Sequence, residues 1–150
     1  MYAAVLFIHS YLRWLVLAAG VALLVAGLRG ASQSPRSLDR LHSAFLGLLD
    51  FQLVLGLWLY FFLSPLAAAA RHNLAVAMKE PNLRFFGVEH LVTMLIAIIV
   101  AHLGRVRSKR KTGPARSRSV AITQTVWLLL TLAAIPWPGL DIARPLFRVF

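Results

Sequence analysis

Long apolar runs constrain this chain more than any other feature of its sequence. Four segments, at about 2–28, 41–63, 85–103 and 120–135, approach or exceed the roughly 20 mostly apolar residues that a helix needs to cross a bilayer. Hydrophobic residues make up 59% of the 150 residues and charged residues 14%, less charge than a soluble domain of this size carries. The sequence therefore predicts an all-α membrane protein, a single domain built as an up-down bundle of four transmembrane helices.

The segments that flank these runs carry predictions of their own. Pro136 and Pro138 are expected to end the fourth helix, because proline breaks helices. Ser64-Pro65 is a typical helix start, and the alanine-rich stretch after it predicts a short interfacial helix over about 66–79. The first ten residues contain neither a basic segment nor a small-residue cleavage site, so they are interpreted as part of a retained first helix.

The net charge of +11 comes from basic residues that lie mainly between the apolar runs. Three arginines in the first link and seven basic residues between the third and fourth runs fall on one side of the membrane, ten in all. The ten are Arg29, Arg36, Arg40, Arg105, Arg107, Lys109, Arg110, Lys111, Arg116 and Arg118. The positive-inside rule places them in the cytoplasm and both termini on the outer, periplasmic side of a bacterial inner (cytoplasmic) membrane. The run 105–118 has no interleaved aromatic residues, so no nucleic-acid partner is expected.

Four histidines fall within or at the ends of the apolar runs. Ionisable residues are costly in a membrane, so each needs a partner or a purpose. His9 and His90 both lie ~8–11 Å below the outer surface if each residue adds ~1.5 Å. His42 and His102 both lie near the inner surface. The histidines therefore form two pairs that are matched in depth, an outer pair and an inner pair.

Two histidines at one depth on neighbouring helices are suited to bind a haem iron from both faces. The sequence predicts one bis-histidine haem b at His9 and His90, and a second haem at His42 and His102 as an open alternative. Gly87 and Ala97, which share a small-residue face with His90, are expected to make room for the macrocycle. The same small residues also suit plain close packing of helices. The absence of cysteine excludes covalent haem attachment through a C-x-x-C-H motif.

The remaining polar residues of these segments have several open interpretations. Arg13 lies one turn after His9 and is a candidate to neutralise a haem propionate, as is Arg84; Arg13 also suits an ion pair with Asp50. Glu89 points away from the His90 face and suits a pair with Arg84 or Arg13, or a protonatable role near a quinone. His72 is expected to be an exposed histidine of the outer link.

The stretches HSYLRWLVL, LHSAFLGLLDFQLVLGLWLYF and EHLVTMLIAIIVAHLGRVRSKRK resemble small four-helix bacterial membrane proteins of the cytochrome b and cytochrome b-like group. The resemblance covers the first three helices and implies a haem-b protein of the electron-transfer type. The matched polar positions are His9, Arg13, His42, Asp50, Glu89, His90 and His102. The chain departs from the large cytochrome b of quinol oxidoreductases, in which two histidine pairs stand on just two helices.

These observations together predict a membrane b-type cytochrome that passes electrons within or beside a respiratory redox complex. We expect an electron-transfer protein or subunit of such a complex, in contact with other membrane subunits and a quinone, and not a stand-alone enzyme. Two alternatives stay open at this point. One is a haem-free accessory or structural subunit of a larger membrane complex, in which the small-residue face is a subunit interface. The other is a proton-coupled transporter.

Overall fold

The computed structural model describes residues 1–30 and 34–147, and the regular structure in these ranges is entirely helical. This confirms the all-α prediction. The elements are α1 (Tyr2–Leu28), α2 (Pro35–Trp58) continued by a π-helical turn (Leu59–Leu63), α3 (Pro65–His72), α4 (Leu74–Ala77), α5 (Pro81–Arg84), a second π-helical turn (Phe85–Glu89), α6 (His90–Lys109) and α7 (Gly113–Ala133).

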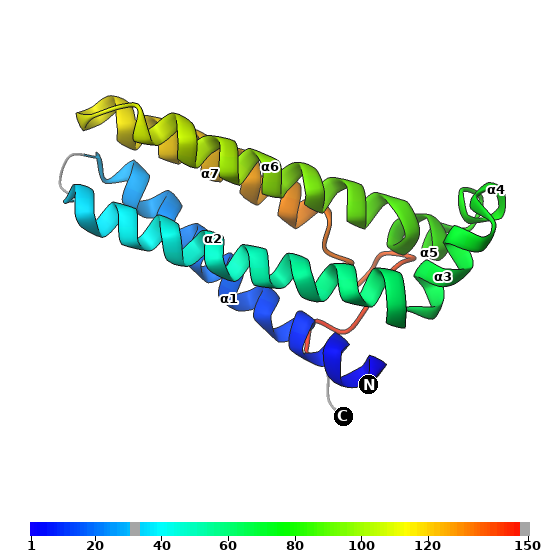
Figure 1. Ribbon diagram of the computed structural model, residues 1–150. Helices are drawn as coiled ribbons and strands as arrows, with labels where there is room; N and C mark the ends of the chain where they lie inside the picture. Colours follow the sequence, from blue (N-terminus) through cyan, green and yellow to red (C-terminus); the bar gives the residue numbers. More distant parts are fainter. Residues whose placement is uncertain (31–33, 148–150) are drawn as a thin grey trace.

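The four long helices lie side by side and alternate in direction along the chain (Figure 1). α7 packs against both α1 and α6, and α1 also packs against α2. The short helices α3, α4 and α5 gather at one end of the bundle. The N-terminus and the segment that follows α7 lie at this same end, so α1 and α6 both start there.

Three helical segments are long and apolar enough to cross a membrane: Tyr2–Leu28, Pro35–Leu63 and Pro81–Lys109. They indicate a multi-pass membrane protein in contact with the lipid bilayer. α7, which the sequence also predicts as a span, is not among them. Its first turns are basic, and polar side chains of α7 such as Gln124 and Thr131 are buried inside the bundle, whereas its outward side chains Ile122 and Leu129 are apolar.

The helices extend beyond the apolar runs, because the polar residues at their ends are helical too. α2 begins at Pro35 rather than near residue 41, and the hydroxyl of Ser34 accepts a hydrogen bond from the Ser37 N–H at 3.2 Å. The alanine-rich stretch is helical from Pro65, as predicted from Ser64-Pro65, but it breaks at Asn73. The side chain of Asn73 accepts a hydrogen bond from the Val76 N–H at 3.1 Å and so starts α4 as a separate turn.

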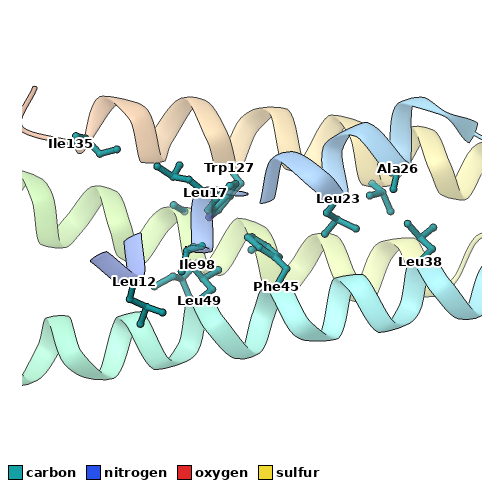
Figure 2. Packing of buried hydrophobic residues seen from close by; sticks show 14 of the residues in the cluster. Leu12, Leu17, Leu23, Ala26, Leu38, Phe45, Leu49, Ile98, Trp127 and Ile135 are labelled. Carbon is teal, nitrogen blue, oxygen red and sulfur yellow. The ribbon is translucent and has the colours of Figure 1, made fainter. Parts of the chain in front are cut away.

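The middle of the bundle is closed by large apolar side chains from all four long helices (Figure 2). Phe45 of α2 meets Trp127 of α7 edge to face, with ring centroids 4.7 Å apart. Leu17 of α1 and Ile98 of α6 belong to the same buried cluster. This layer separates the α3–α5 end of the bundle from the end that carries the basic links.

Small residues allow the helices to approach closely. A Cβ added to Gly20 of α1 would lie 2.1 Å from the Trp127 ring, and one added to Gly27 would lie 2.8 Å from the main-chain nitrogen of Ala121. On α6, a Cβ at Gly104 would lie 2.0 Å from the Thr123 side chain of α7. The small-residue face of α6 is therefore used for helix packing within this chain.

We predict that Gly27→Ala destabilises the bundle by ~1–3 kcal/mol, because the new methyl group meets the α7 backbone, which cannot turn aside. The measurement is the midpoint of thermal unfolding in mild detergent, followed by circular dichroism. Gly47→Ala is the matched control, since nothing lies within 4 Å of a Cβ at Gly47 of α2 and alanine favours helix. Equal midpoints for the two variants would contradict the close contact of α1 and α7.

Candidate functional site

His9 of α1 and His90 at the start of α6 face each other near the α3–α5 end of the bundle. Their ring centroids are 6.5 Å apart and their planes are inclined by 73°. Two imidazoles bound to one metal ion have centroids ~6 Å apart, because metal–imidazole nitrogen bonds are ~2 Å long. The structure thus brings together the outer histidine pair at a separation suited to a shared iron.

Hydrogen bonds set the tautomers of the two imidazoles. Nδ1 of His90 lies 2.8 Å from the carbonyl oxygen of Ala134, which can only accept, so Nδ1 carries the proton and Nε2 keeps its lone pair. Nε2 of His9 lies 3.3 Å from the amide nitrogen of Gln52, a donor, so Nε2 of His9 accepts. A metal-bound histidine commonly donates its other ring N–H to a main-chain carbonyl, and His90 has this arrangement.

The two rings line a cavity of about 180 Å³. Most of its wall is apolar, including Leu49, Leu53 and Ile98. Two arginines, Arg13 and Arg144, also line it, and none of its described lining residues is Asp or Glu. The cavity therefore combines a mostly apolar wall with two imidazoles and two arginines, a lining suited to an apolar ligand that carries anionic groups.

The segment after α7, residues 134–147, returns across the α3–α5 end of the bundle (Figure 1). Ala134, Ile135 and Arg144 of this segment are among the residues that line the cavity. Arg13 and Trp14 of α1 both donate to the carbonyl oxygen of Leu146, at 3.0 and 3.3 Å. Arg144 donates to Oδ1 of Asn82 at 2.9 Å and lies over the Phe86 ring at 4.7 Å. This C-terminal segment thus ties α1 to the start of the third span and supplies one wall of the cavity.

Room for the His9 ring comes from α2. A Cβ at Gly56 would lie 3.2 Å from Cε1 of His9, closer than side chains usually approach. Gln52, one turn earlier on α2, donates a second hydrogen bond to the His9 carbonyl oxygen at 2.9 Å. For His9 to bind a metal through Nε2, the Gln52 amide has to turn away from the ring.

The other residues expected around the outer pair lie outside the cavity. Arg84 binds Glu89 at 2.7 Å, one of the two partners expected for that carboxylate. Gly87 makes room for Ala70 of α3, since a Cβ there would lie 2.2 Å from the Ala70 methyl group. Ala97 is fully buried in the helix-packing core. The space beside His90 that these residues were expected to provide is instead bounded by Met94, Thr131 and the C-terminal segment.

The structure does not bring the inner histidines together. His102 is exposed, and its Nε2 lies 2.8 Å from Oδ1 of Asp50. His42 is fully buried and packs near the Phe45 ring, and no described residue bonds to either of its ring nitrogens. Asp50 stands eight residues beyond His42, ~12 Å along α2. Asp50 thus pairs with His102 and not with Arg13, the partner that the sequence suggested. His72 is exposed, as expected.

A separate charged cluster joins three helices at the end that carries the basic links. Asp39 of α2 binds both Arg105 of α6 and Arg116 of α7, the latter at 2.6 Å. The side chains of the two arginines are only 11% and 14% exposed, whereas Asp39 is 39% exposed. One carboxylate therefore holds two nearly buried guanidinium groups, which fastens α2 to the α6–α7 pair.

Three residues that line the cavity were not predicted from the sequence: Gln52, Gly56 and Arg144. Gln52 and Gly56 have no distinctive motif, although both stand on α2 at the i and i+4 positions that share one face. Arg144 lies in an irregular segment with proline and glycine, whose path no periodicity predicts. One signal points to Arg144: in a membrane protein, an arginine that lies inside the bundle needs a partner there.

No protein-family model, no curated protein and no solved structure matches this chain.

We predict that Asp39→Asn destabilises the protein by ~1–3 kcal/mol, because it leaves two nearly buried arginines without their shared carboxylate. The partial exposure of Asp39 keeps the loss below that of a fully buried pair. Thermal unfolding in detergent measures it. Glu89→Gln is the matched control: it breaks an exposed pair with Arg84 and should cost ~0–1 kcal/mol. A larger loss for the control would show that the Asp39 cluster does not fasten the helices.

Proposed function

We propose that this protein is a membrane b-type cytochrome that transfers electrons through one haem b held between His9 and His90. The observation that carries the proposal is the pairing of these two imidazoles across a mostly apolar cavity, with His90 oriented by the Ala134 carbonyl. The resemblance of the first three helices to small cytochrome b-like proteins points the same way.

Each group of residues in the cavity would have a separate role in binding the haem. His9 and His90 would be the axial ligands, and the Ala134 carbonyl would keep Nε2 of His90 directed at the iron. Arg13 and Arg144 would stand near the anionic propionates, and the apolar wall would exclude water. When bound, haem b supplies the one-electron chemistry of its iron, whose potential these groups tune.

The membrane placement belongs to the same proposal. All four long helices would span a bacterial inner membrane, α7 included, since its Gln124 and Thr131 are buried whereas Ile122 and Leu129 are exposed. The basic links would face the cytoplasm, and both termini and α3 would lie at the periplasmic side. The haem would then sit in the outer half of the bilayer, within reach of partners on that side and of a quinone or other subunits of a redox complex.

We propose one haem per chain. His102 is engaged by Asp50 and His42 lies apart from it in the core, so these two imidazoles do not meet in the described part of the chain. The alternative of a haem-free accessory subunit loses part of its basis, because the small-residue face of α6 packs inside this chain and is not open to another.

The first test is a reduced-minus-oxidised visible spectrum of the protein purified from haem-producing cells, with haem counted per chain. We expect low-spin b-type bands and one haem per chain, and an unchanged ratio for His42→Ala. His90→Ala should lose most of the haem, while His72→Ala, the matched control on an exposed helix, should keep it. A colourless wild type would favour the accessory subunit, and full haem in His90→Ala would overturn the assigned pair.

A second prediction concerns Arg144. If its guanidinium lies beside the haem, Arg144→Gln should lower the reduction potential, because a nearby cation favours the electron-rich reduced state. Redox titration of the visible bands measures the shift. Arg71→Gln is the control, since Arg71 is exposed and lies over Tyr60 and Phe61 away from the histidine pair. Equal potentials for wild type and Arg144→Gln would remove Arg144 from the site.

A further inference from the structure

Asp50 and His102 form a polar pair on the outer surface of the bundle. Nε2 of His102 lies 2.8 Å from Oδ1 of Asp50, and the two side chains are 45% and 50% exposed. Both residues lie within helical segments long and apolar enough to cross a membrane. An ionisable pair in such a place is costly in lipid, and it marks a functional position more often than a structural one.

The surroundings of the pair are apolar and exposed. Phe51 and Val54 flank Asp50 on α2, and Ile99 and Leu103 flank His102 on α6; all four are more than half exposed. Asp50 stands ten residues beyond Arg40, ~15 Å along the helix from that basic end. His102 stands three residues before Arg105, ~5 Å from the basic end of α6, so the pair lies where the apolar surface meets that basic end. A molecule with an apolar tail and a polar headgroup suits this position.

The pair also lies next to the histidine cavity. Leu49 and Ile98 line that cavity, and Asp50 follows Leu49 directly while His102 stands one helical turn after Ile98. The pair and the cavity therefore use neighbouring positions on α2 and α6, with the buried Leu49 on the cavity side and Asp50 on the exposed side.

The hydrogen-bonding capacity of the pair is only partly used. Their mutual bond engages Nε2 of His102 and Oδ1 of Asp50. Among the described residues, no further hydrogen bond engages Nδ1 of His102 or the second carboxylate oxygen. The pair thus offers a ring nitrogen and a carboxylate oxygen side by side to a ligand that carries its own hydroxyl or carbonyl groups.

We propose that Asp50 and His102 bind the headgroup of a lipid-soluble quinone or quinol. Such a molecule reaches the site along the lipid-facing surface. A quinone oxygen accepts from Nδ1–H when the His102 imidazole carries both protons, and a quinol hydroxyl donates to the free oxygen of Asp50. The binding itself needs no haem; the use of the bound molecule as electron partner of the His9–His90 site rests on the function proposed above.

The test is a titration of the full-length protein, with ¹⁵N-labelled histidine, in mild detergent. The probe is a benzoquinone that carries one isoprenyl unit, and the control is a hydrocarbon of the same tail length without oxygen. We expect the imidazole ¹⁵N signals of His102, assigned by their loss in His102→Gln, to shift saturably with the quinone and not with the hydrocarbon. Asp50→Asn should weaken this binding at least tenfold, while Glu89→Gln, a carboxylate elsewhere on the surface, should leave it unchanged.

Two results would overturn the proposal. One is the absence of a saturable shift at His102. The other is a change of molar mass in Asp50→Asn, measured by light scattering, which would show that a second copy of the chain covers the pair. The haem content of the same samples is measured separately, so a haem-loaded protein that ignores quinone contradicts only this inference, and a haem-free protein that binds quinone contradicts only the function proposed above.

Discussion

The close contact of α1 and α7 through Gly20 and Gly27 decides how the rest of the bundle is arranged. Because Gly20 leaves room for the Trp127 ring and Gly27 lets the backbones approach, α7 lies against α1 as well as against α6. The end of α7 then falls beside His90, so that the Ala134 carbonyl can orient its imidazole. The segment after α7 is delivered across the cavity to Arg13 and Trp14 of α1. Two glycines near the other end of α1 thus govern the geometry of the histidine site.

The all-α fold could be predicted because apolar runs of sufficient length have few other stable forms in lipid. Helix ends were predicted less well. α2 begins at Pro35 and α6 continues to Lys109. The residues that add these turns are largely polar, so a search for apolar runs does not include them. α7 shows the reverse difficulty. The mean hydropathy of α7 is modest because the helix contains polar residues such as Gln124 and Thr131. These two side chains are buried in the bundle, so the side of α7 that faces outward can still be mostly apolar.

The candidate site was half predictable for a similar reason. Depth in a bundle can be counted along the chain, and the count brought His9 and His90 together correctly. The direction in which a side chain points depends on which neighbours surround its helix, and counting does not give it. His102 turns to the outer surface and His42 to the core, so a pair that matches in depth fails to meet. Arg144 depends on an irregular fold-back that only the assembled helices define.

The position of the C-terminal segment has a consequence for how the protein is made. All four long helices are synthesised before residues 134–147, so His9 and His90 can be inserted and aligned while one wall of the cavity is still missing. A bulky planar ligand has its widest entrance at that stage of biosynthesis. Once Arg144 reaches Asn82 and Leu146 reaches α1, the segment covers part of the cavity, and a ligand bound as proposed would exchange more readily if those contacts opened. The order of synthesis therefore favours loading before closure.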